Sequence, residues 1–86
     1  MSRQRTIETI LNSEFVSIGE LVRLTGARYS TLKYYTEEGI LQFEQEDINL
    51  TRRYKRENAL ARIEEIKNLK NKGLSIVEIK GILLNK

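Results

Sequence analysis

The sequence contains no cysteine and no histidine. Without cysteine, the chain can form neither disulfides nor thiolate metal sites, and without histidine it lacks the side chain most used for acid–base catalysis and metal binding. We therefore expect a protein that is not an enzyme and has no metal site and no cofactor.

Long apolar segments are also missing. No apolar run approaches the roughly 18 residues needed to span a bilayer, and the first eleven residues lack the apolar centre of a signal peptide. We expect a soluble, cytoplasmic protein with no membrane partner. The 86 residues, 40% of them hydrophobic, make at most one domain with a small core.

The net charge of +3 is unevenly distributed along the chain. Residues 1–35 carry five basic and three acidic groups, residues 36–50 carry five acidic groups and no basic one, and residues 51–72 carry eight basic and three acidic groups. Clustered lysine and arginine bind a phosphate backbone, so the excess around the RRYKR run indicates nucleic acid. The alternative is an ordinary solvated helix face with salt-bridge partners.

Residues 17–41 predict two short helices joined by a tight turn. Ser17 and Glu20 have the spacing of a capping box, which starts a helix, and Gly26 tolerates the left-handed conformation that ends one. A second helix should run from about Arg28 to Glu38, with Leu32 directed inward. This is the arrangement of a helix-turn-helix.

The outer surface of the second helix is rich in hydrogen-bond donors and flat rings, which suit a groove of nucleic acid. Tyr35 is expected inward with Leu32, and Gly39 should end the helix. The candidate DNA-contacting residues of this helix are Arg28, Tyr29, Ser30, Thr31, Lys33 and Tyr34.

Apolar residues at helical spacing also occur near both ends of the chain. A short helix over 3–11 is expected to support the core, or to act as a minor-groove arm through Arg3 and Arg5, with residues 12–15 as a link. Residues 56–71 predict a third main helix, followed by a second capping box at Ser75–Glu78. The expected buried positions of these two last helices are Leu60, Ile63, Ile66, Leu69, Ile76, Ile79, Ile82 and Leu83.

Four segments together resemble the DNA-binding domain of the MerR family of bacterial regulators: IGELVRLTG, TLKYYTEEGIL, RRY at 52–54, and LARIEEIKNLKNKGLSIVEIKGIL. The resemblance covers roughly residues 16–84. It implies a mainly α fold, a winged helix-turn-helix with a small β-hairpin wing, over residues 16–86, with residues 1–15 as an added N-terminal arm.

The resemblance also implies where the wing lies. Residues 40–43 and 50–54 would be its two strands, and residues 44–49 its acidic tip. Arg53 matches the family arginine that reaches DNA, Tyr54 the aromatic residue after it, and Arg52 would hold a phosphate. Because acidic side chains repel a backbone within the screening length of roughly 8 to 10 Å, we expect the base of the wing to touch DNA.

Departures from the family pattern affect the expected mechanism. Arg28 stands where relatives generally have a small residue that caps the helix, and such a cap typically stabilises a helix by about 1 kcal/mol. Ser30 stands where many relatives have an arginine. The sequence ends after the helix expected to begin at Ser75, where full-length relatives continue into a dimerisation helix and an effector domain. It therefore resembles either a short BldC-type or excisionase-like factor or a fragment of a larger regulator.

The leading prediction is a sequence-specific double-stranded DNA-binding protein that regulates transcription, monomeric when free and bound to DNA in several copies. The alternatives are an excisionase-like architectural factor in recombination and a protein-interaction module that uses Tyr29, Tyr34 and the acidic segment 44–47. Steep salt dependence would favour DNA over an apolar protein partner.

Overall fold

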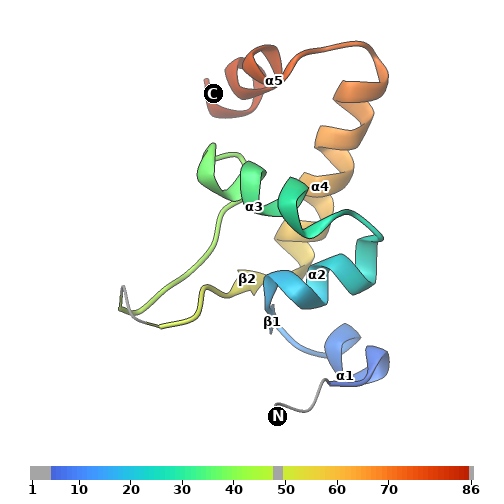
Figure 1. The fold of residues 1–86 in the computed structure, drawn as a ribbon, viewed down its shortest axis with the longest axis vertical. Coiled ribbons are helices and arrows are strands. Elements are labelled where there is room, and N and C mark those ends of the chain that lie inside the picture. Colours follow the sequence, from blue (N-terminus) through green and yellow to red (C-terminus); the bar gives the residue numbers. More distant parts are fainter. Residues whose placement is uncertain (1–4, 48–49, 86) are drawn as a thin grey trace.

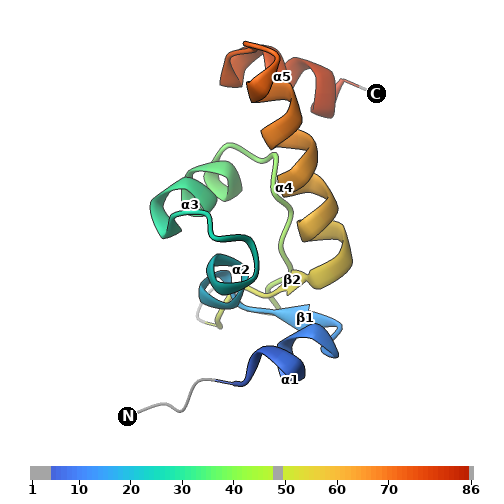
Figure 2. The ribbon, with the colours of Figure 1, turned by 90° about the vertical axis from the view of Figure 1, so that its right-hand side faces the viewer.

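The computed structural model describes residues 5–47 and 50–85. In chain order its elements are α1 (Ile7–Leu11), β1 (Phe15–Val16), α2 (Ile18–Thr25), α3 (Tyr29–Glu37), β2 (Tyr54–Lys55), α4 (Arg56–Asn71) and α5 (Ile76–Leu84). Helices α1 and α5 lie at opposite ends of the molecule, and the long helix α4 runs from β2 towards α5 (Figures 1 and 2).

Both predicted capping boxes are present. Ser17 Oγ accepts a hydrogen bond from the Glu20 amide at 3.1 Å, and Glu20 Oε1 accepts one from the Ser17 amide at 2.9 Å. Ser75 and Glu78 make the same reciprocal pair at the start of α5. These bonds satisfy amide donors that have no partner within the helix, and they set the first residues of α2 and α5 as predicted.

The helix-turn-helix forms from α2 and α3. Gly26 ends α2 with a positive φ of 75°, a conformation that costs glycine little because it has no Cβ. Helix α3 then begins after Arg28, whose side chain makes no capping hydrogen bond within the described part of the chain. The expected loss of an N-cap at this position is therefore confirmed.

The core joins the helix-turn-helix to the rest of the chain. Leu32 and Tyr35 of α3 are buried as predicted, and the turn after α3 carries Ile40 and Leu41 into the same core. Helix α1 contributes Ile10, whereas its neighbours Ile7 and Leu11 stay exposed. The side chains of this core are Ile10, Val16, Leu21, Leu32, Tyr35, Ile40, Leu41, Tyr54, Ala59, Ile63, Ile66, Ile79 and Leu83.

The wing differs from its prediction in the position of its strands. Residues 40–43 form no strand, and within the described residues of the wing the backbone pairing is a single bridge between Glu44 and Arg53, with N···O distances of 2.7 and 2.9 Å. Strand β2 pairs instead with β1, so that Phe15 faces Lys55 and Val16 faces Tyr54. Part of the predicted link over residues 12–15 is thus a strand.

The last two helices bury most of the predicted positions. Ile63, Ile66, Ile79 and Leu83 are buried, and Leu60, Leu69 and Ile76 are half-buried. Ile82 remains 47% exposed, because it falls outside the narrow stripe that faces α4, so its predicted burial was wrong. No helix in the described residues has the length and apolar character needed to cross a membrane.

The described elements are mainly helical, with a short antiparallel pair of strands. The predicted fold class, a winged helix-turn-helix, is confirmed. In Figure 1 the wing extends to the left, away from α4.

Candidate nucleic-acid interface

The solvent-facing side of α3 carries four of the predicted contact residues. Tyr29 and Lys33 are one helical turn apart, as are Ser30 and Tyr34, so these four side chains lie together on the outer surface. The two tyrosines are 55% and 45% exposed, and Arg28 is exposed at the start of the helix. This face offers two cations and three hydroxyl groups to a ligand.

Thr31 lies elsewhere. Its side chain is half-buried and lines a groove of about 610 Å³ between the helix-turn-helix and α4, together with Tyr35 and Ile63. The helical turn that exposes Lys33 directs Thr31 towards α4, because residues two apart point to different sides of a helix. The structure therefore does not place Thr31 with the other predicted contacts of α3.

A small hollow of about 170 Å³ joins α3 to the base of the wing. Tyr29 and Lys33 form its α3 side, Thr51 and Arg52 form its wing side, and Ile18 and Tyr54 complete the lining. Residues that are about 20 positions apart in sequence thus border one concave surface. The two charged residues that line this hollow, Lys33 and Arg52, are both positive.

The two wing arginines are held by different aromatic rings. The Arg52 guanidinium carbon lies 4.6 Å from the centre of the Phe43 ring, and that of Arg53 lies 5.5 Å from the centre of the Phe15 ring. Arg53 also approaches Glu46 at 3.7 Å, but both side chains are mostly exposed, so this ion pair is weak. Successive side chains of an extended segment alternate in direction, which explains why only Arg52 lines the hollow.

Tyr54, predicted to contact DNA, is in the core. Its side chain is 1% exposed, and its hydroxyl lies 2.8 Å from Thr36 Oγ1. Because the Thr36 hydroxyl donates its one hydrogen to the Leu32 carbonyl, the Tyr54 hydroxyl is the donor in the pair. This buried bond ties β2 to α3, so Tyr54 has a structural role and the prediction of a direct DNA contact is corrected.

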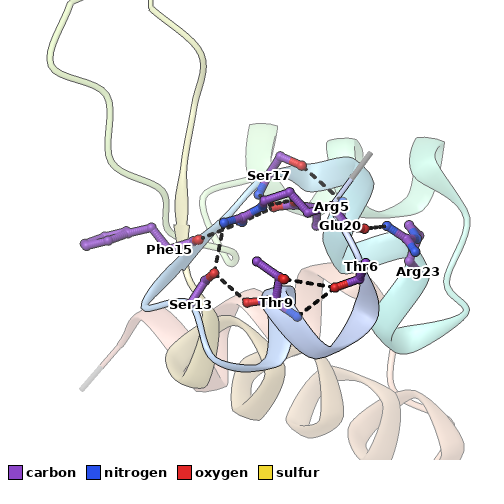
Figure 3. Close-up of polar contacts among 8 residues, drawn as sticks. All are labelled: Arg5, Thr6, Thr9, Ser13, Phe15, Ser17, Glu20 and Arg23. Carbon is purple, nitrogen blue, oxygen red and sulfur yellow. Dashed lines mark hydrogen bonds and ion pairs between the residues drawn. The ribbon is translucent and has the colours of Figure 1, made fainter. Parts of the chain in front are cut away.

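Arg5 is also bound within the protein. Its guanidinium makes two hydrogen bonds to the Glu20 carboxylate, at 2.6 and 2.7 Å (Figure 3). The hydrogen bond from Arg5, helped by that from the Ser17 amide, lowers the pKa of Glu20 from 4.5 to about 2. Arg5 is therefore not presented as a minor-groove arm, and Arg3 lies outside the described residues.

Sequence reasoning missed the residues that orient the arginines. Phe15 and Phe43 were not singled out, because Phe15 is far from Arg53 in sequence and its contact depends on the pairing of β1 with β2. The ion pair of Arg5 with Glu20 likewise joins two residues that are 15 positions apart. The local sequence pattern contains no signal for the contacts of Phe15 and Arg5, whereas the predicted pairing of residues 40–43 with 50–54 would bring Phe43 close to Arg52.

Comparison with known proteins places the chain in a family. The family model described as MerR HTH family regulatory protein matches residues 16–86, which is most of the chain. Neither the curated proteins nor the solved structures gave a match. At the level of the family, the match supports a regulator that binds double-stranded DNA. The chain therefore belongs to the MerR family of helix-turn-helix regulatory proteins.

Proposed function

We propose that this chain binds specific sequences of double-stranded DNA and regulates transcription, with α3 in the major groove and the base of the wing on the adjacent backbone. The hollow shared by Tyr29, Lys33, Thr51 and Arg52 carries this proposal. It places donors from α3 and a cation from the wing on one surface, as contact with both a groove and its flanking phosphates requires.

The exposed residues of α3 divide by chemistry into two roles. Arg28 and Lys33 can donate to the acceptors that guanine presents in the major groove, and the hydroxyls of Tyr29 and Ser30 add shorter donors. Tyr34 lies at the outer side of the same face. It would hold a phosphate.

The wing supplies the remaining backbone contacts. Arg52 and Arg53 would hold phosphates, each with its guanidinium stacked near an aromatic ring that limits its motion. Glu46 lies 3.7 Å from Arg53, so its carboxylate would have to move away before a phosphate could bind Arg53, because like charges repel at this range.

Several copies are needed for useful selectivity. One short recognition helix and one wing contact few base pairs, and a genome offers on the order of a million or more competing sites. We infer that the 86-residue chain is monomeric when free and that copies bind together at repeated or inverted sites.

Selection from a random duplex pool, followed by binding assays at several salt concentrations, tests the proposal. We expect one enriched sequence class, preferred at least about a thousandfold over random duplex, and affinity that falls steeply with salt. Ultracentrifugation with and without the selected duplex should show monomers alone and several copies on DNA. Failure to enrich any duplex would refute DNA binding, and a stable dimer without DNA would refute the monomer.

A footprint then separates the two DNA-binding roles. Protection of promoters would support transcriptional regulation. Protection of recombination attachment sites would instead favour the architectural role.

A further inference from the structure

Arg5, which lies before the region matched by the family model, occupies the centre of a polar cluster. Its Nε and Nη2 atoms donate to the two carboxylate oxygens of Glu20, Nη1 donates to Ser13 Oγ at 2.9 Å, and Nη2 also donates to the Phe15 carbonyl at 3.3 Å. Figure 3 shows these bonds converging on one guanidinium. One side chain thus connects the residues after α1, strand β1 and the start of α2.

The backbone of Arg5 is held as well. Arg23, in the last turn of α2, donates to the Arg5 carbonyl oxygen. Ser13 in turn donates its hydroxyl to the Thr9 carbonyl at 2.7 Å, which ties the cluster to α1. The segment before α1 is therefore attached to α2 through both its side chain and its main chain.

The segment that Arg5 holds also contacts the base of the wing. Phe15 pairs with Lys55 in the β1–β2 sheet, and its ring lies under the guanidinium of Arg53. The Glu14 and Ser13 carbonyls accept hydrogen bonds from the amide and the Nε atom of Arg56, both at 2.8 Å. Contacts therefore run without a break from Arg5, through Phe15, to Arg53.

We propose that Arg5 and Glu20 form a latch that positions Arg53 for DNA through Phe15. Arg5 is a positioning residue and does not touch DNA itself. The inference rests on the proposed function, because its readout is affinity for DNA. It gives residues 5–15 a defined purpose: they fix the position of the Phe15 ring, and hence the position of Arg53 relative to α3.

Two substitutions that change the net charge in opposite directions distinguish the effect of the latch on DNA affinity from the effect of net charge alone. Arg5→Gln removes a positive charge, and Glu20→Gln removes a negative charge while keeping a residue type that completes a capping box. A pure charge effect would weaken DNA binding in the first variant and strengthen it in the second. The latch instead predicts about a two- to fivefold loss of specific affinity in both, the range expected for a partly exposed ion pair.

Glu8→Gln is the matched control, because it removes an acidic charge from exposed α1, outside the latch. It should leave affinity unchanged or slightly higher. All affinities are to be measured for the selected duplex at a temperature where circular dichroism shows each variant folded. If Arg5→Gln does not fold, Arg5→Lys keeps the charge, loses the two-pronged geometry, and should show a smaller loss in the same direction.

A double-mutant cycle tests the route through Arg53. In an Arg53→Ala background, Arg5→Gln should lower the affinity for the selected duplex by less than about 1.5-fold, because the side chain that Arg5 positions is gone. If Arg5 and Arg53 acted independently, their losses of binding free energy would add. Three results would overturn the latch while leaving DNA binding intact. They are tighter binding by Glu20→Gln, unchanged binding by both Arg5→Gln and Glu20→Gln, and additive losses in the double-mutant cycle. If the wild-type chain enriches no duplex, the proposed function fails and the latch fails with it.

Discussion

Leu32 and Lys33 are neighbours on α3, and replacing each by alanine should separate folding from DNA binding. Leu32 is fully buried, so Leu32→Ala should lower the free energy of unfolding by about 2 to 5 kcal/mol. An 86-residue domain has on the order of 4 to 13 kcal/mol in total, at about 0.05 to 0.15 kcal/mol per residue. The loss should lower the melting temperature by about 10 °C or more.

Lys33→Ala should have the opposite profile. The lysine is exposed and lines the hollow between α3 and the wing, so its loss should change stability by less than about 0.5 kcal/mol. If Lys33 reads a base edge, affinity for the selected site should fall by about 1 to 3 kcal/mol, with relaxed preference at one base pair. Thermal melts and binding to selected and random duplexes measure both effects.

The comparison of duplexes decides the role of Lys33. Equal losses on selected and random DNA would show that Lys33 contacts phosphate and does not read a base. Unchanged binding to both would remove this face of α3 from the interface. A Leu32→Ala variant with an unchanged melting temperature would contradict the packing of α3 on the core.

Three further substitutions test the wing, the buried hydrogen bond between Tyr54 and Thr36, and the contribution of Glu20 to the latch. Arg53→Ala should weaken DNA binding and reduce the salt slope by about 0.9 while barely changing the melting temperature, since the side chain is 57% exposed; unfolding would mean that it is structural. Tyr54→Phe should lower the free energy of unfolding by about 0.5 to 1.5 kcal/mol in urea, because the bond to Thr36 is lost, and a large affinity loss without destabilisation would contradict its burial. The pKa of Glu20 is lowered to about 2, so its stabilising effect is present above about pH 4.5 and lost as pH falls towards 2. The difference in unfolding free energy between wild type and Glu20→Gln, about 1 kcal/mol after screening, should shrink across this range, and a constant difference would refute the ionic role.

Features set by neighbouring residues were predicted well. The capping boxes at Ser17 and Ser75 and the turn at Gly26 depend on residues at most three or four positions away, so their spacing is visible in the sequence. The inward positions of α3 and α4 follow the helical period for the same reason. These local rules were enough to place the helix-turn-helix.

Features set by distant residues were not predicted. Tyr54 reads as a polar aromatic residue beside a basic run, and only its pairing with Val16 and its bond to Thr36 show that it is buried. Thr31 looks equivalent to Ser30 until the position of α4 is known. The engagement of Arg5 by Glu20 depends on how α1 folds back onto α2, which no spacing rule describes.

The proposed function requires that the exposed face of α3 and the base of the wing form one DNA-binding surface. Amide chemical-shift mapping of the labelled chain, titrated with the selected duplex, tests it most directly. We expect the largest shifts at Tyr29, Ser30 and Lys33 and at residues 51–53, with small shifts over α5. Shifts concentrated on α1 or α5, with α3 and residues 51–53 unaffected, would contradict it.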